Sequence, residues 1–273
     1  MNHLITELNK QDFHKIKYVT DKCKNIEVRA VVNGNNPGRI FVENPLEPTT
    51  ALIWIQGHEG YQIVGDAQCK SFVTGLEEFI RNNLEPELKM RNINWVEIGV
   101  DFTWDRTIQA MFTKRNISSD IQHVFSKNEN SLPIEIQDNK VVIQRIDRDL
   151  LKSGRLANHS FLEKKILRFW NSLDSFSQHG FGYFAEMNNN VVSLCFSAFV
   201  ADQTHAIEIE TLEEFRRKSY GTAVARAFVQ ECVEKGIHPY WDCSPDNTGS
   251  IGVAQTIGLS SSFDYKIFCC NLS

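Results

Sequence analysis

One stretch of the chain, residues 204–236, constrains the fold more than any other. It begins with an alternating strand, His205 to Thr211, continues through the basic turn R-R-K-S-Y-G at 216–221, and ends in an amphipathic helix, Thr222 to Lys235, before Gly236. A strand that passes through such a turn into a helix points several free backbone N–H groups at one place, and the helix dipole also attracts anions there. The stretch therefore predicts a site for phosphate groups.

The rest of the second half predicts an α+β arrangement. The order is a hairpin, a helix, antiparallel strands, a helix, a strand, a helix and a strand, with apolar spacing of 2 in the strands and 3.6 in the helices. The expected elements around 204–236 are strands Ile134–Ile136 and Lys140–Ile146, a helix with its buried stripe from Leu162 to Leu173, strands Tyr183–Met187 and Val191–Val200, strand Ile237–Cys243, helix Ser250–Ile257 and strand Phe263–Cys269.

The first half predicts a smaller α/β domain with a core but no recognisable chemistry. Its expected elements are a hairpin of Glu27–Val32 with Gly38–Val42, strands Ala51–Gln56 and Tyr61–Val64, a helix from an Asp66 N-cap to Leu84, and strand Trp95–Val100. The polar segment from Lys114 to Pro133 indicates a junction, so the domains are expected at 1–130 and 131–273. Both halves share a plan of strands, hairpin and helix, which leaves a degenerate copy of the second half as an alternative for the first.

Charge and composition exclude several classes of protein. The net charge of −5 is spread evenly, with 15 Lys/Arg against 17 Asp/Glu in residues 1–130, so neither a nucleic-acid surface nor a membrane surface is expected. The start of the chain does not resemble a signal peptide and no apolar run approaches a membrane span, which predicts a cytosolic protein. The seven cysteines and eight histidines show no ligand spacing, so we expect no metal.

The turn at 216–221 fits the acyl-CoA signature R/Q-x-x-G-x-G/A of the GNAT N-acetyltransferase superfamily, with Ser219 in the place of the first Gly. The strand ending in I-E-T before the turn, and the segment W-D-C at 241–243 followed by Asn247 and Ser250, are also similar to that superfamily. The combination resembles most closely a bacterial branch related to zwittermicin-resistance acetyltransferases, whose members carry an extra N-terminal domain.

This resemblance implies a mixed, mostly antiparallel sheet flanked by helices, and acetyl-CoA as co-substrate. Amides of the turn would hold its pyrophosphate, and the strand before the turn would splay from its neighbour to receive the pantetheine arm. If Ser219 needs a positive φ, its side chain costs about 1 kcal/mol relative to Gly. The residues expected at the cofactor are Thr211, Arg216, Arg217, Lys218, Ser219, Tyr220, Gly221, Thr222, Asn247 and Ser250.

The resemblance also implies transfer of an acetyl group to a primary amine, with a small molecule as the acceptor and a base that takes a proton from the attacking amine. The candidates are Glu210, which we favour, His205 and Glu208; alternation along the strand puts the two glutamates on one face and the histidine on the other. A homodimer is compatible with the sequence.

Two features leave the chemistry open. Ala254 stands where many relatives have a Tyr that reprotonates the thiolate, so Tyr265 or Tyr240 would have to substitute, or the thiolate leaves unaided. Cys243 raises an acyl-cysteine route, although core packing is the commoner use of such a residue. The alternatives are therefore a CoA-binding sensor or interaction module without turnover, and an aminoacyl transferase that uses charged tRNA, which the absence of a basic face disfavours.

Overall fold

The computed structural model describes residues 5–127 and 141–272. The chain divides into two compact units, unit 1 with residues 1–122 and 264–273, and unit 2 with residues 123–263. Each passage between the units lies inside a long strand, β6 (Ile117–Lys127) and β12 (Leu259–Asn271). The expected boundary between residues 130 and 131 lies outside the described residues, as does the expected strand Ile134–Ile136.

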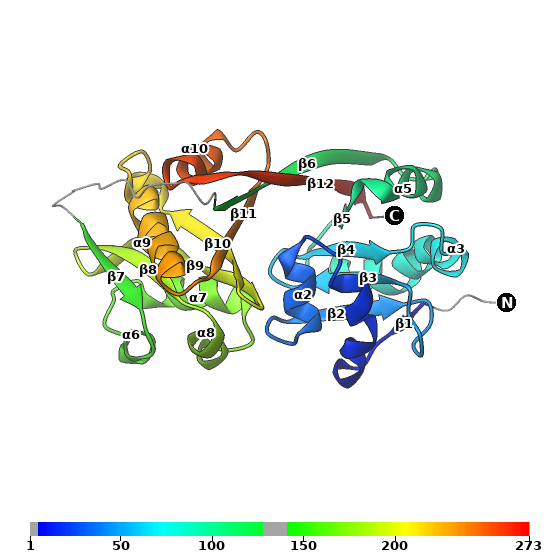
Figure 1. Cartoon of the computed structure of the whole chain (residues 1–273), viewed down its shortest axis with the longest axis horizontal. Coiled ribbons are helices and arrows are strands. Elements are labelled where there is room, and N and C mark those ends of the chain that lie inside the picture. Colours follow the sequence, from blue (N-terminus) through cyan, green and yellow to red (C-terminus); the bar gives the residue numbers. More distant parts are fainter. Residues whose placement is uncertain (1–4, 128–140, 273) are drawn as a thin grey trace. The chain divides into compact units, whose positions relative to one another are not determined.

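Unit 1 is built on a sheet in the order β1-β2-β3-β4-β5-β12-β6. Among its described strands, β4 and β5 pair in parallel, whereas β1–β2, β2–β3, β3–β4 and β5–β12 are antiparallel. Its other elements, shown in blue to green in Figure 1, are β1 (Thr6–Glu7), η1 (Lys10–Ile16), α1 (Lys17–Thr20), α2 (Ile26–Val32), β2 (Gly38–Val42), β3 (Thr50–Ile55), β4 (Gly60–Gly65), α3 (Lys70–Phe79), the π-helix η2 (Ile80–Leu84), α4 (Glu85–Met90), β5 (Trp95–Val100), η3 (Phe102–Trp104) and α5 (Asp105–Met111).

Two local expectations in unit 1 are wrong. Residues 27–32, expected as a strand, form most of helix α2. The helix is buried on several sides, and the alternation of Glu27 and Arg29 with Val28 and Ala30 imitates the period of a strand. The N-cap of α3 is Cys69 and not Asp66, because the Asp66 carboxylate accepts the N–H of Gln68 in a turn before the helix. The strands expected at 38–42, 51–56, 61–64 and 95–100 are confirmed.

Unit 2 confirms the expected strands and helices among its described residues, with one difference. The expected helical stripe from Leu162 to Leu173 is divided, because α7 ends at Phe169 and Leu173 begins the separate helix α8. Helix α6 was not expected. The sheet runs in the order β12-β6-β11-β10-β9-β8-β7. Its elements are β7 (Val142–Ile146), α6 (Arg148–Ser153), α7 (His159–Phe169), α8 (Leu173–His179), β8 (Gly182–Met187), β9 (Asn190–Ala201), β10 (Thr204–Thr211), η4 (Glu213–Phe215), α9 (Tyr220–Glu234), β11 (His238–Cys243) and α10 (Thr248–Thr256).

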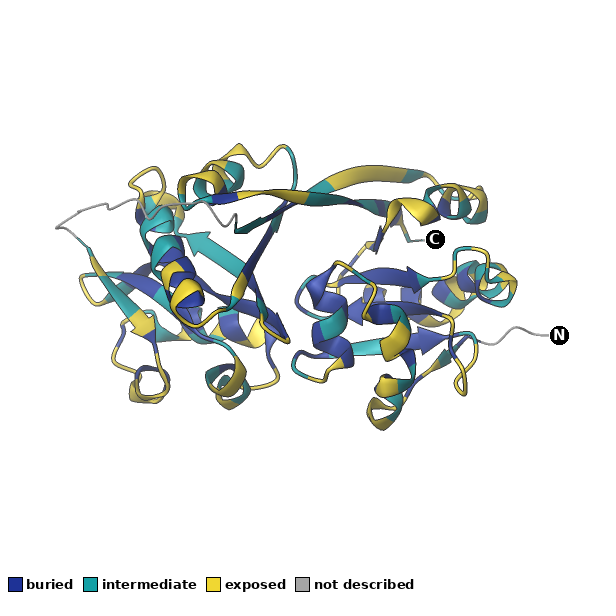
Figure 2. Ribbon diagram, viewed as in Figure 1, coloured by how far each residue is buried: buried dark blue, intermediate teal, exposed yellow. Residues whose placement is uncertain are grey.

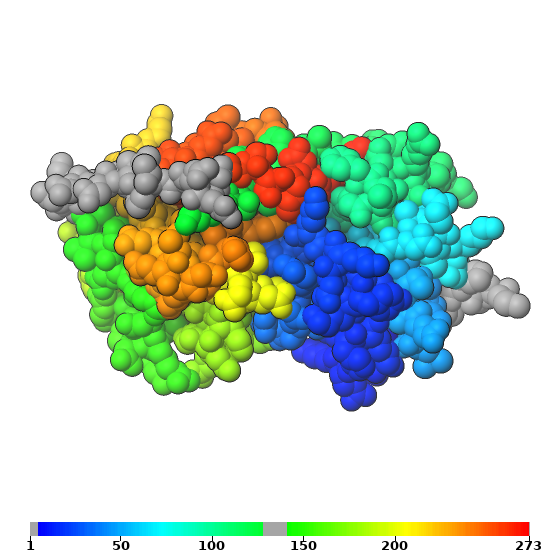
Figure 3. All heavy atoms as spheres, viewed as in Figure 1, coloured from blue at the N-terminus to red at the C-terminus, as the bar shows by residue number. Residues whose placement is uncertain are grey.

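Helices α7 and α9 pack on opposite faces of this sheet. Phe169 of α7 makes edge contacts with Phe196 and Phe199 of β9, whereas Phe228 of α9 stacks on Phe181 with ring centroids 4.6 Å apart. In Figure 2, α9 shows a dark blue stripe and a yellow one, as expected of a helix that covers a sheet with one face. Figure 3 shows its orange atoms at the surface.

The two units repeat one plan. In unit 1 the order β3, β4, α3, β5, α5, β6 matches the order β9, β10, α9, β11, α10, β12, and in both cases the second strand is antiparallel to the first and parallel to the third. The last strands are exchanged. Residues 123–126 of β6 pair with β11, and residues 266–271 of β12 pair with β5. Each unit is therefore completed by the end of the other unit's last strand.

Candidate functional site

Strands β10 and β11 separate from one another along their length. They pair in parallel only from residues 204–206 to residues 238–240, whereas β10 stays paired with β9 as far as Thr211. Beyond Ala206, the edge of β10 that faces β11 has no ladder partner among the described residues. A cavity of about 620 Å³ opens there, lined by Ile207, Glu208, Ile209, Glu210, Thr211, Arg216, Gly221, Trp241, Asp242, Cys243, Asn247, Gly249, Ser250 and Val253.

The turn between β10 and α9 presents a set of backbone amides beside this cavity. Arg217 and Ser219 adopt left-handed conformations with φ of 60° and 62°. The N–H of Arg216 bonds the Glu213 carbonyl and the N–H of Ala223 bonds the Ser219 carbonyl. Residues 217–222 lie between these two. Their backbone N–H groups have no hydrogen-bond acceptor within residues 5–127 and 141–272. Such a nest of amides at the start of a 15-residue helix is suited to an anion.

Several side chains of the turn have partners or positions away from these amides. The Arg216 Nε donates to the Thr211 carbonyl at 3.2 Å, and the Lys218 ammonium donates to the Glu214 carbonyl at 3.0 Å. The Tyr220 ring is buried in the core of unit 2, so this residue offers only its backbone to the turn. Ser219 has a positive φ, which is the condition under which its side chain costs energy relative to glycine. Its side chain makes no capping hydrogen bond.

The two glutamates of β10 line the cavity from the face that α7 covers. Glu210 forms an ion pair with Lys165 of α7, although both side chains keep about a quarter of their surface exposed, at 28% and 26%. Burial raises the pKa of Glu208 to about 6, and the nearby cations Arg168 and Lys165 oppose that rise. Asp242 of β11 lines the same cavity and also acts on Glu208. A protonated amine would be attracted to this end of the cavity.

His205 lies outside the cavity, on the face of the sheet opposite to the glutamates. Its side chain is 5% exposed, its Nδ1 lies 2.9 Å from the Ser197 hydroxyl, and its ring contacts Phe181. Burial and the nearby Lys235 lower its pKa to about 4. The structure therefore places this candidate base in the core as a neutral imidazole.

Asn247 and Ser250 line the cavity, and both have structural partners. The Asn247 carboxamide oxygen accepts the N–H of Ser250 at 3.0 Å and so caps α10. The Ser250 hydroxyl accepts the indole N–H of Trp241 at 2.8 Å. These bonds orient β11 and α10 around the cavity mouth.

The candidate acyl acceptor Cys243 lies at the cavity, whereas the candidate acids for the CoA thiolate do not line it. Cys243 lines the cavity, and burial raises the pKa of its thiol, which disfavours a thiolate nucleophile. Ala254 is fully buried, and Tyr240 and Tyr265 are 5% and 3% exposed. No tyrosine is among the described residues that line the cavity.

Sequence reasoning missed two charged residues near the cavity. A signal for Asp242 was present, because it lies between the apolar residues Trp241 and Cys243 and alternation therefore puts its side chain on the opposite face of the strand. Lys165 gave no signal, because its proximity to Glu210 depends on how α7 crosses the sheet.

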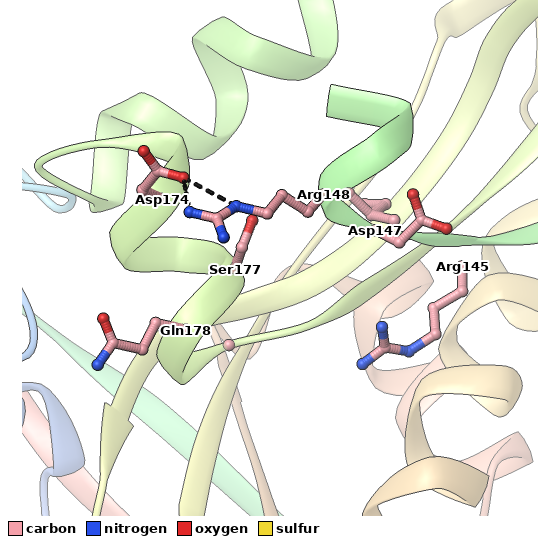
Figure 4. A pocket seen from close by; sticks show the side chains of 8 residues that line it. Arg145, Asp147, Arg148, Asp174, Ser177 and Gln178 are labelled. Atoms are coloured by element: carbon pink, nitrogen blue, oxygen red, sulfur yellow. Dashed lines mark hydrogen bonds and ion pairs between the residues drawn. The ribbon is translucent and has the colours of Figure 1, made fainter. Parts of the chain in front are cut away.

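A second depression of about 460 Å³ lies at the end of β7, between α6 and α8 (Figure 4). Its charges are partnered within the protein. The Arg148 Nε donates to Asp174 at 3.1 Å, and Arg145 pairs with Glu231 of α9 at 2.9 Å. We assign no function to it.

In the described part of the chain there is no cluster of three metal-ligating side chains and no helix long and apolar enough to cross a bilayer.

Comparison with known proteins places these features in context. The profile of the GNAT acetyltransferase family matches residues 17–268. The uncharacterized N-acetyltransferase YdfB of Bacillus subtilis (strain 168) is 28% identical over 267 residues, which are 97% of this chain and 98% of the relative. A GCN5-related N-acetyltransferase-like protein from Streptococcus suis has a similar structure, with a TM-score of 0.68 at 14% identity over 96% of this chain and 99% of that chain.

A tandem GNAT protein from the clavulanic acid biosynthesis pathway has a TM-score of 0.62 at 8% identity, covering 98% of each chain. At such identities these structures are evidence for the fold alone. The likeness extends over both units, so the α+β fold with a mixed, mostly antiparallel sheet is confirmed and resembles that of tandem GNAT proteins.

Proposed function

The chain belongs to the GNAT acetyltransferase family, and we propose that it transfers an acetyl group from acetyl-CoA to the primary amine of a small molecule, within unit 2. The proposal rests on the backbone N–H groups of residues 217–222, which have no hydrogen-bond acceptor among the described residues. They lie beside the point where strands β10 and β11 separate. The finer placement in the zwittermicin-resistance branch rests on the I-E-T strand, the basic turn and the W-D-C strand.

The pyrophosphate of the co-substrate fits the turn between β10 and α9. Backbone N–H groups there are exposed donors, and the helix dipole adds a favourable field for an anion. Arg217 and Lys218 are exposed on the turn and add positive charge. Thr222 lies in the first turn of α9, where its N–H is also without an intrahelical partner.

The pantetheine arm fits along the open edge of β10. The amide groups of such an arm pair well with backbone donors and acceptors that lack a neighbouring strand. Thr211, Asn247 and Ser250 line this part of the cavity. A thioester held here would bring its carbonyl between the strands, where N–H groups of β10 stabilise the developing oxyanion.

Glu208 is the base that the geometry supports best, in place of the Glu210 that the sequence favours. It lines the cavity, and its pKa of about 6 keeps it ionised yet basic near neutral pH. Glu210 is already engaged by Lys165. Glu208 would take the proton, directly or through water, from an ammonium drawn in by the carboxylates, and the free amine would then attack the thioester.

The acyl group passes directly to the amine in this proposal. The raised pKa of Cys243 speaks against an acyl-cysteine step, and CoA is a tolerable leaving group as a thiolate without a dedicated acid. The buried Ala254 at the usual tyrosine position is the feature that favours the second candidate, a CoA-binding module without turnover.

One experiment separates the two candidates. Calorimetric titration with CoA measures binding, and release of the free CoA thiol across a panel of small primary amines measures transfer. Binding with turnover supports the transferase, and binding without turnover across the panel supports the module. Absence of CoA binding would contradict both.

A further inference from the structure

Helix α7 carries two cations at the margin of its buried face. Leu162, Ile166 and Phe169 form that face, and Lys165 and Arg168 lie beside it. The Lys165 ammonium lies 5.9 Å from the Phe161 ring centroid and forms the ion pair with Glu210. The side chain is partly buried, and both contacts place its ammonium beside Glu210 of β10.

The two glutamates that face this helix would otherwise repel one another. Side chains two apart on a strand stand about 7 Å from each other on the same face. The charged groups around Glu208 are Arg168 and Lys165 from α7, Glu210 from its own strand and Asp242 from β11. The Cys195 thiol of β9, also nearby, is neutral because burial raises its pKa. Carboxylates at such a distance raise each other's affinity for protons, and a nearby cation offsets that effect.

We propose that Lys165 is a positioning residue of the acetyltransferase site, which gives Glu208 and Glu210 different roles. It holds Glu210 as a paired carboxylate and leaves Glu208 as the proton acceptor. This inference rests on the proposed function in taking Glu208 as the base, but the pairing itself is independent of turnover.

The physical consequence is a base that is ionised at neutral pH. Without the ammonium, Glu210 would lose its ion-pair partner, Arg168 would remain as the nearby cation, and Glu208 would bind its proton more tightly. A larger fraction of the enzyme would then hold a protonated base, which cannot accept a proton from the amine. Both carboxylates would also compete for the ammonium group of the substrate.

The test is direct titration of Glu208 by carbon NMR in protein labelled at the glutamate carboxyl carbon, with Glu208→Gln to assign the signal. We expect Lys165→Met to raise the Glu208 pKa by about 0.5–1 unit, and Lys165→Arg to restore most of it, since a nearby opposite charge shifts a carboxyl by roughly this amount or more. Lys164→Met, which removes an exposed lysine from the same helix, should leave the titration unchanged.

A second variant moves the titration in the opposite direction. Glu210→Gln removes the neighbouring negative charge and leaves Lys165 to act on Glu208 alone, so the Glu208 pKa should fall. The acid limb of the pH profile of kcat/KM should follow both shifts, while CoA affinity stays within twofold of the wild-type value. An unchanged Glu208 titration in folded Lys165→Met, or a rise in Glu210→Gln, would overturn the role of Lys165. Failure of the proposed function would give a different result. The Glu208 pKa would still shift with the expected sign in both variants, but no amine would be acetylated.

Discussion

The hydroxyl of Thr211 lies 3.1 Å from the position that a Cβ atom on Gly221 would take. Gly221 is in ordinary helical conformation, so a side chain there would be crowded by this close approach between the end of β10 and the start of α9, and not strained by a positive φ. The same Thr211 hydroxyl lies 2.8 Å from the Ser193 hydroxyl of β9, which fixes its position. These contacts hold the turn with the free amides of residues 217–222, the amide turn, beside the cavity.

Gly221→Glu should abolish CoA binding, because it adds bulk against Thr211 and a negative charge beside the proposed pyrophosphate site. We expect a loss of affinity on the order of 100-fold or more in calorimetry, given the cost of charge repulsion and lost hydrogen bonds to charged groups. Gln230→Glu, which puts the same charge at an exposed position later in α9, is the control and should bind normally. Unchanged affinity in Gly221→Glu would contradict the assignment of the turn.

Ser219→Gly should stabilise the folded protein by about 1 kcal/mol, because Ser219 is held at a φ of 62° where glycine has no steric cost. Denaturation with urea measures the change in free energy of unfolding. Lys218→Gly serves as the comparison, since Lys218 has no positive φ and should lose stability. A destabilised Ser219→Gly variant would mean that the hydroxyl makes a contact worth more than the strain.

Glu208→Gln should lower kcat/KM by about 100-fold to 10,000-fold, the usual contribution of a general base. In the wild type, activity should rise with pH through about 6, the pKa that burial gives Glu208, because the carboxylate must be ionised to accept a proton. The variant should lose this limb of the profile. If the limb persists in Glu208→Gln, another group is the base.

His205 should influence stability, with little effect on transfer. Its pKa is lowered to about 4 in the folded protein by burial and Lys235, against about 6.5 in an unfolded chain. The unfolded state therefore binds more protons between these values, and stability should decline as the pH falls from about 6.5 to about 4. His205→Gln should flatten this part of the stability curve measured by chemical denaturation, and an unchanged slope would contradict the burial of a neutral imidazole.

Calorimetry should find one CoA molecule per chain, because three backbone donors are engaged in the turn of unit 1 that corresponds to the amide turn. The N–H of Asp66 bonds the Thr49 carbonyl, the N–H of Cys69 bonds the Asp66 carbonyl, and the Asp66 carboxylate takes the N–H of Gln68. That carboxylate would also repel a phosphate. A stoichiometry of two, or residual binding in Gly221→Glu, would show a second site in unit 1.

The amino-acid sequence was enough to predict the strand, turn and helix of residues 204–236 and most strands of both units. Alternation, helical spacing and turn residues are local properties, and the amide turn is formed by neighbours along the chain. The same locality made Glu27–Val32 misleading, because the alternation of Glu27 and Arg29 with Val28 and Ala30 is typical of a strand, whereas the segment folds as a helix buried on several sides.

Contacts between distant segments decided the rest. The exchange of β6 and β12 depends on pairing across more than a hundred residues, and no local pattern encodes which strand completes which unit. The different surroundings of Glu208 and Glu210 are of the same kind. Both occupy equivalent alternating positions in β10, and only the way α7 crosses the sheet puts Lys165 on one of them and leaves the other desolvated, because solvation and charge depend on what surrounds a side chain in space.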